Sequence, residues 1–194
     1  MQGKLYKLFN LSLSVRDICF IGIFTAFTAV SSQFSIPMPA GVPFTLQTFV
    51  IPLAGIILGA KKGALSALVY VILGITGVPV FTGFRGGISV IFGVTGGYIL
   101  SFPILAFCAG LGSDLYIKIK NTWGRNIIFA SGLIIGTAVN YVCGMLMGKF
   151  VVSCGMREAF ALFVFPYIPT AVIKIILAWI FGLNIKKVLK KIYK

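Results

Sequence analysis

The segment 127–152 reads IIFASGLIIGTAVNYVCGMLMGKFVV, and Lys149 is the first charged residue in it. A helix needs about 20 consecutive apolar residues to cross the hydrocarbon core of a bilayer, so this segment predicts a membrane span. The rest of the chain has the same character. Of its 194 residues, 59% are hydrophobic and only 10% are charged, whereas about one quarter of a soluble domain is charged. The sequence therefore predicts an integral membrane protein.

Six apolar segments, separated by charged residues or by Pro and Gly, predict six spans. The predicted spans are residues 18–35, 45–60, 64–78, 95–115, 127–152 and 160–185. Six spans occupy about 120 residues, which leaves no room for a separate soluble domain. The predicted fold is therefore a single all-helical membrane domain over residues 1–194. The second and third spans are short and need support from neighbouring segments.

The basic residues divide unequally between the two sides of such a bundle. Thirteen lie in the amino-terminal segment, the second-to-third turn, the fourth-to-fifth loop and the tail, against three on the other side, Arg85, Lys149 and Arg157. Cytoplasmic loops carry the excess of Lys and Arg, so both termini are predicted to be cytoplasmic. This asymmetry accounts for the net charge of +14 without a nucleic-acid partner. The apolar run after Arg16 has no small-residue cleavage site, which predicts a retained first helix.

The chain lacks the side chains that most enzymes use. It has no histidine, and its only acids are Asp17, Asp114 and Glu158. General acid–base catalysis and zinc sites depend on these residue types, so the sequence predicts no catalytic residue, no metal site and no cofactor. The four cysteines show no C-x-x-C spacing and are interpreted as small buried hydrophobic residues.

Two predicted helices carry faces of small residues. In the fifth span, Asn140 stands at the centre of a row with a period of four that also contains Gly132, Gly136, Gly144 and Gly148. Residues four apart share a helix face, and such a glycine face favours close helix packing in lipid. The Asn140 carboxamide needs either a neighbouring helix or a ligand as partner. The first span has Gly22, Ala26 and Ala29 on one face, which either packs inside the bundle or docks a second membrane protein.

The two long loops on the weakly basic side are unusual in composition. Residues 36–43 hold three prolines and no charge, and residues 77–97 are rich in glycine and aromatic residues. A loop that only connects two helices in water is ordinarily polar. We interpret both loops as an ordered lid over a cavity that opens outward; the alternative is a packing loop without a ligand.

Lys174 is a basic residue in the interior of the sixth predicted span. It lies about 15 Å of helix from the tail, close to the bilayer midplane, where a lysine costs about 2.5–3.5 kcal/mol on insertion scales. No predicted span holds an acid away from its ends. Lys174 therefore either extends through lipid to the interface or meets an anionic ligand in a protein-lined cavity, and we favour the cavity. Pro166 and Pro169 interrupt the sixth span just before it, as expected of a broken helix that lines a cavity.

Residues 93–98 read GVTGGY and lack the Gly-Lys-Ser/Thr of a P-loop, so they are not expected to bind ATP. We expect Gly96 and Gly97 to present backbone groups to a ligand, with Tyr98 as an aromatic wall.

These motifs together resemble the BioY family, the biotin-binding S components of energy-coupling factor (ECF) transporters. The resemblance covers about residues 22–174 and rests on PFTLQT at 43–48, LG at 73–74 with GVPVF at 77–81, GG at 86–87, TGGY at 95–98, and PYIP at 166–169 followed by Lys174. The family implies a six-helix S-component bundle with ordered extracellular loops, which binds biotin from outside. It also implies import together with a membrane T subunit and two cytoplasmic ATPases. The chain departs from the family at Val94, where Pro is usual, and at Ala171, where Asp is common.

The resemblance and the chemistry of biotin together give each candidate residue a role. Lys174, with Arg85, is expected to hold the carboxylate. Polar side chains and the backbone of the glycine-rich loops are expected to satisfy the ureido group, and aromatic residues to pack on the fused rings. The other candidate ligand-binding residues are Gln47, Phe81, Gly86, Gly87, Gly96, Gly97, Tyr98, Asn140, Tyr141 and Tyr167. The resemblance assigns the small face of Gly22, Ala26 and Ala29 to the T subunit.

Three alternatives remain open at this point. The first is that the chain is an S component for another small carboxylate, such as a biotin precursor. The alanine at position 171, where the family commonly has an acid, is the reason to consider it. An ion-coupled secondary transporter would need an intramembrane carboxylate, which the sequence lacks. A membrane enzyme would need an acid–base pair, which it also lacks.

Overall fold

The structure, a computed structural model, describes residues 13–192 of the chain. Its elements in chain order are α2 (Val15–Gln33), β1 (Ser35–Ile36), β2 (Phe44–Thr45), α3 (Gln47–Leu58), α4 (Ala60–Ile75), α5 (Ile88–Ile91), α6 (Gly96–Lys118), α7 (Thr122–Val152), α8 (Met156–Phe163), the 3-10 helix η1 (Phe165–Tyr167) and α9 (Ile168–Ile192). The predicted all-helical class is confirmed. Of the cations assigned above to the cytoplasmic side, Lys4, Lys7 and Lys194 lie outside the described residues.

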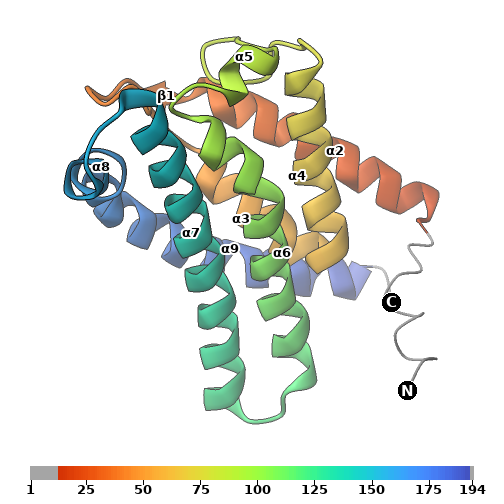
Figure 1. The fold of residues 1–194 in the computed structure, drawn as a ribbon. Helices are drawn as coiled ribbons and strands as arrows, with labels where there is room; N and C mark the ends of the chain where they lie inside the picture. The colour runs from red at the N-terminus through yellow and green to blue at the C-terminus, as the bar shows by residue number, and fades with distance from the viewer. Residues whose placement is uncertain (1–12, 193–194) are drawn as a thin grey trace, which may run out of the picture.

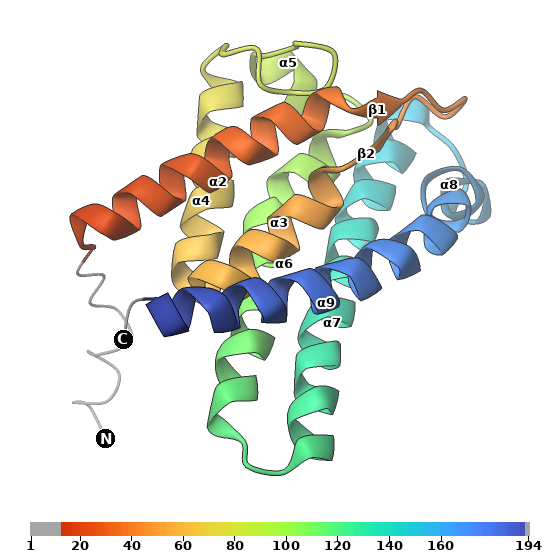
Figure 2. The ribbon, with the colours of Figure 1, turned by 180° about the vertical axis from the view of Figure 1, so that it is seen from behind.

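The long helices form two layers (Figures 1 and 2). Helices α4, α6 and α7 make one layer, and α2, α3 and α9 cross it on one face. The β1–β2 hairpin and α5 gather at one end, near the start of α6 and the end of α7. The hairpin pairs Ser35 with Thr45 and Ile36 with Phe44. The chain segments predicted as a lid therefore lie together at one end of the bundle.

Each predicted span overlaps helix in the structure. Four helical stretches, residues 15–33, 96–118, 122–152 and 156–186, are long and apolar enough to cross a membrane by length and composition. Helix α3 is apolar but shorter, with 12 residues, and α4 has 16. The predicted break in the last span is confirmed, because η1 separates α8 from α9.

The predicted loop between the fourth and fifth spans is wrong in length. Only residues 119–121 connect α6 and α7. The Asn121 side chain accepts a hydrogen bond from the Trp123 N–H at 3.1 Å and caps α7 well before its apolar run begins at Ile127. A side-chain cap satisfies one of the N–H groups left free at a helix start, so the helix extends through polar residues that hydropathy excluded.

The glycine row of α7 allows close packing, as the spacing predicted, and Gly132, Gly136 and Gly144 pack against α6. A Cβ atom added to Gly132 would lie 2.6 Å from the carbonyl oxygen of Cys108, and one added to Gly144 would lie 2.2 Å from the ring of Tyr98. Both distances are shorter than any ordinary contact. The glycines therefore set how closely the two helices approach.

The small face of α2 is not buried in the bundle. Gly22 and Ala26 are exposed and Ala29 is half-buried, and a Cβ on Gly22 would meet no atom within 4 Å. Helix α2 instead packs on α4 through small polar residues, with the Thr25 hydroxyl donating to the Ser66 carbonyl at 3.0 Å. The first of the two alternatives for this face, packing inside the bundle, is therefore wrong for Gly22 and Ala26.

Two ion pairs join helix ends away from the lid. Lys62 of α4 pairs with Asp17 of α2 at 2.6 Å, and Lys186 of α9 pairs with Asp114 of α6 at 3.1 Å. The other Asp114 oxygen accepts the Ala60 N–H at 3.0 Å, which caps α4. Two of the three acids in the sequence thus form ion pairs with lysines, at the end of the bundle that the sequence assigns to the cytoplasm.

Candidate ligand-binding site

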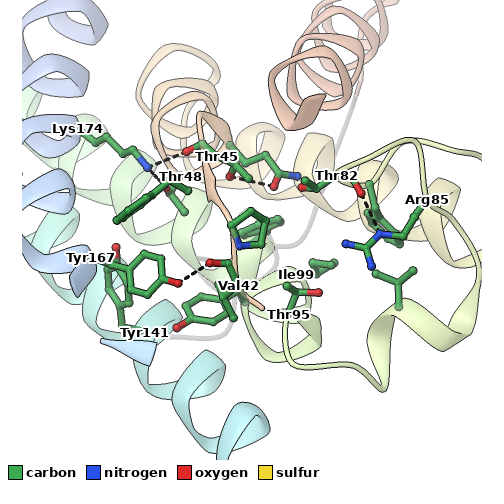
Figure 3. Close-up of a pocket in the computed structure, with 17 residues that line it drawn as sticks. Val42, Thr45, Thr48, Thr82, Arg85, Thr95, Ile99, Tyr141, Tyr167 and Lys174 are labelled. Atoms are coloured by element: carbon green, nitrogen blue, oxygen red, sulfur yellow. Dashed lines mark hydrogen bonds between the residues drawn. The ribbon is translucent and has the colours of Figure 1, made fainter. Parts of the chain in front are cut away.

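A cavity lies beneath the lid, between the two helix layers (Figure 3). It is lined by Val42, Pro43, Phe44, Thr45, Gln47, Thr48, Phe81, Thr82, Arg85, Val90, Thr95, Tyr98, Ile99, Phe102, Tyr141, Tyr167 and Lys174. Its free volume is about 60 Å³, below the roughly 300–1,000 Å³ of typical small-molecule sites. A vitamin-sized ligand therefore needs the lining segments to move apart.

Lys174 reaches this cavity from α9. Its ammonium nitrogen donates to the Thr45 carbonyl oxygen at 2.7 Å and to the Thr48 hydroxyl oxygen at 2.9 Å. The side chain therefore points inward, toward the start of α3 (Figure 3), and the alternative of a lysine extending through lipid is wrong.

The contacts of Lys174 leave it able to bind an anion. An ammonium group has three N–H donors, and Thr45 and Thr48 accept two of them. No acid is among the described residues that line the cavity. A positive charge in a partly apolar, half-buried site favours an anionic partner strongly, because solvent screens it little there.

Three tyrosines from three different elements also line the cavity. The Tyr98 and Tyr141 rings meet edge to face with centroids 6.0 Å apart, and Tyr141 lies 6.4 Å from Tyr167. The Tyr98 hydroxyl donates to the Phe163 carbonyl, which ties α6 to the end of α8. Aromatic faces of this kind suit a flat or fused-ring ligand.

Both lid segments are held by hydrogen bonds to helices. The Tyr167 hydroxyl donates to the Val42 carbonyl, and the Tyr167 ring contacts Phe44 with centroids 4.7 Å apart. In the second segment, the Gln33 amide donates to the Phe81 carbonyl at 3.1 Å. Hydrogen bonds therefore tie both segments to helices, and residues of both segments line the cavity.

Arg85 lies across the cavity from Lys174 in Figure 3. It is exposed, and its Nε donates to the Thr82 carbonyl at 3.1 Å within the same loop. The two cations therefore stand at different ends of the lining, one deep and one at the surface. A single small carboxylate is expected to use one of them rather than both.

The structure brings together seven of the twelve residues predicted to bind ligand. Lining the cavity are Gln47, Phe81, Arg85, Tyr98, Tyr141, Tyr167 and Lys174. Gly86, Gly87, Gly96, Gly97 and Asn140 do not line it.

The five others have structural roles. A Cβ on Gly96 would lie 1.7 Å from the Ile91 carbonyl oxygen, and one on Gly97 would lie 2.1 Å from that of Cys143. Gly86 approaches the Val78 carbonyl in the same way, and Gly87 has a φ of +98°, which favours glycine. For Gly86, Gly96 and Gly97 the group that approaches closely is protein backbone, whereas Gly87 is explained by its positive φ.

Asn140 has a helix partner rather than an open side chain. Its amide nitrogen donates to the Tyr98 carbonyl at 2.9 Å and to the Ser101 hydroxyl at 2.8 Å. Of the two partners considered for this carboxamide, the neighbouring helix is the one observed. It positions Tyr98, which does line the cavity.

Sequence reasoning missed several lining residues, above all Thr45 and Thr48, which hold the ammonium. Both fall inside the quoted run PFTLQT at 43–48. The signal was the polar spacing at the start of an otherwise apolar helix, but nothing in that spacing shows which residue faces Lys174.

Ala171 lies outside the cavity. It is buried, with 9% of its surface exposed, and it faces a separate apolar groove that α7, α8 and α9 share. No acid is among the described residues that line this groove or the cavity.

Comparisons with known proteins point to one family. The model of the BioY family matches residues 4–191. The chain is 40% identical over 162 residues to "Probable biotin transporter BioY" of Pyrococcus horikoshii, covering 84% of this chain and 91% of that protein. It is 37% identical over 173 residues to "Biotin transporter BioY" of Thermotoga maritima, covering 89% and 97%.

A solved structure shares the fold. It is described as the S-component for biotin from an ECF-type ABC transporter, and it superposes with a TM-score of 0.76 at 27% identity, covering 91% of this chain and 92% of that one. The family model matches nearly the whole chain, and the relatives match along most of their own length. The chain therefore belongs to the BioY family.

Proposed function

We propose that this chain is the biotin-binding S component of an ECF transporter, a subunit for vitamin uptake and not an enzyme. The observation that carries the proposal is the Lys174 ammonium. One of its three N–H donors has no acceptor among the described residues, and no acid is among the described residues that line the cavity. The family and its biotin-transporter relatives support the substrate.

The chemistry of biotin suits the lining. We infer that the carboxylate meets Lys174 in a charge-assisted hydrogen bond. The fused rings pack against Tyr98, Tyr141 and Tyr167, and Phe81 closes the side toward the lid. Gln47 is already bonded to the Tyr70 hydroxyl and to the Thr45 hydroxyl, so it meets the ureido group only after exchanging one of these partners.

Five of the predicted residues influence the ligand only indirectly in this proposal. They are Asn140, Gly86, Gly87, Gly96 and Gly97. Their contacts fix Tyr98 and the lid, so their substitution is expected to alter binding through the shape of the cavity. Arg85, at the exposed end, attracts the anion as it approaches.

We further propose a six-span bundle in a prokaryotic cell membrane, with the lid outside and both termini in the cytoplasm. The excess of basic residues at the opposite end supports this orientation. Partners are a membrane T subunit and two cytoplasmic ATPases. The exposed small residues Gly22 and Ala26, with Ala29 at the edge of the same face, offer a close-packing surface for the T subunit.

The test is equilibrium binding to the purified full-length chain in lipid nanodiscs. Titration calorimetry with biotin should give saturable binding at one site per chain. Dethiobiotin, which keeps the carboxylate and the ureido group but lacks the thioether ring, should bind more weakly, because it loses contact with the tyrosines. Tighter binding of dethiobiotin than of biotin would assign the chain to a biotin precursor. No binding of either would overturn the substrate.

A further inference from the structure

A second hollow lies on the outside of the bundle, between α7 on one side and α8 and α9 on the other. It has a free volume of about 320 Å³, and its lining is apolar except for Thr137 and the Tyr141 hydroxyl. Ile134, Val142 and Val172 line it and are also about half exposed. The groove therefore opens sideways, toward the lipid that surrounds a membrane-spanning bundle.

Two cations mark one end of this groove. Lys149 follows the groove residues Tyr141 and Met145 at intervals of four on α7, so it continues the same helix face. Arg157 precedes the groove residue Phe160 by three on α8, which places it on the groove face as well. Helix α8 lies beside the lid end of α7 (Figure 1).

Neither cation has a partner within the part of the chain that the structure describes. Both belong to residues 13–192, and neither side chain makes a hydrogen bond or ion pair there. The nearest acid in sequence, Glu158, accepts the Gly155 N–H at 3.1 Å instead. Because Lys and Arg are depleted on this side of the membrane, two unpaired cations at the end of one groove need an explanation of their own.

We propose that the groove is a binding site for one anionic phospholipid. An acyl chain lies in the groove between α7 and α9, and the head-group phosphate lies between Lys149 and Arg157. The apolar lining fits hydrocarbon, and the two cations give the charge complementarity that a phosphate requires. Tyr141 is the one described residue that lines both the groove and the cavity, so a bound lipid also supports a wall of the ligand site.

Native mass spectrometry of the full chain in detergent tests the proposal. Phosphatidylglycerol is added stepwise, with phosphatidylcholine as the zwitterionic comparison. Wild type should retain one phosphatidylglycerol in preference to phosphatidylcholine. The double variant Lys149→Gln with Arg157→Gln should bind it about 30-fold more weakly, since each of the two cations near a phosphate contributes to affinity.

Two controls separate this site from general attraction. Lys118→Gln with Lys120→Gln removes the same charge at the end of α6 and in its connection to α7, and should leave the retained lipid unchanged. Ala138→Phe should fill the groove and expel the lipid, whereas Ile135→Phe, which changes an exposed α7 residue outside the groove, should not. Equal binding by the Lys149 and Arg157 double variant, equal loss in the distal variant, or equal retention of phosphatidylcholine would overturn the proposal.

Discussion

Lys174 and Thr48 are 126 positions apart in the sequence, yet the ammonium of one donates to the hydroxyl of the other at 2.9 Å. This contact joins α9 to the first turn of α3 at the floor of the cavity. The Thr45 carbonyl completes the arrangement at 2.7 Å. Two neutral oxygen acceptors thus hold a cation without neutralising it, which leaves the charge for a ligand.

Lys174→Met should weaken biotin binding about 10- to 150-fold, because a hydrogen bond to a charged group contributes about 1.5–3 kcal/mol. Lys118→Met, at an exposed position, should have no effect. Repeating the titration with biotin amide, which lacks the negative charge, separates charge recognition from packing. The amide should bind more weakly than biotin to wild type but equally to Lys174→Met. An undiminished preference for biotin in the variant would mean that another group, with Arg85 the first candidate, holds the carboxylate.

Thr48→Val should keep the shape of the side chain but remove the hydroxyl acceptor. The ammonium is then held only by the Thr45 carbonyl, and we expect a loss of affinity of about 2- to 10-fold, in line with one ordinary hydrogen bond. Calorimetry provides the measurement. Thr76→Val, which removes an exposed hydroxyl at the end of α4, is the matched control. Unchanged affinity in Thr48→Val would show that this threonine does not position the lysine.

Tyr167→Phe should speed ligand exchange. The substitution keeps the ring that contacts Phe44 at 4.7 Å and removes only the hydroxyl bonded to the Val42 carbonyl. Because the small cavity must open for a ligand to enter, loosening this tie should raise both the association and the dissociation rate by about 2- to 10-fold. Stopped-flow measurements with biotin give both rates. A change in dissociation alone would assign the hydroxyl to the ligand rather than to the lid.

Gly144→Ala should destabilise the protein, since the added Cβ would lie 2.2 Å from the Tyr98 ring. Overpacking of this kind costs about 1–3 kcal/mol, and the melting temperature in detergent should fall by several degrees. Gly22→Ala should keep or slightly raise the melting temperature, because a Cβ there meets nothing within 4 Å and alanine favours a helix more than glycine does. Equal stability of the two variants would contradict the close packing of α7 on α6.

Ala26→Leu should separate binding from transport. The residue is exposed and remote from the cavity lining, so the variant should bind biotin as wild type does. If the small face docks the T subunit, biotin uptake by cells that carry the complete ECF assembly should fall strongly, because the larger side chain prevents close helix approach. Leu100→Phe, on an exposed position of α6, is the control. Normal uptake by Ala26→Leu would remove this face from the docking surface.

Much of the molecule followed from the sequence. Hydropathy located the helices, because burying an uninterrupted apolar run in lipid outweighs most other local preferences. The four-residue glycine period in α7 predicted a face for close helix packing, because that period is a property of the helix itself. The prolines gave the break before α9, and the uncompensated charge of Lys174 gave a reason to expect a cavity.

Only the tertiary structure decided which side chains and backbone groups meet in and around the cavity. Two glycines and an asparagine are residue types that often contact ligands, yet here each meets protein. Gly96 lies against Ile91, Gly97 against Cys143, and Asn140 donates to Tyr98. The sequence shows that a glycine permits close approach or that a buried amide needs a partner, but it does not show the partner's identity. That identity depends on how helices distant in the chain cross, and the crossing is set by the packing of the whole bundle. For the same reason, Thr45 and Thr48 became visible as the support of Lys174 only once α3 and α9 stood side by side.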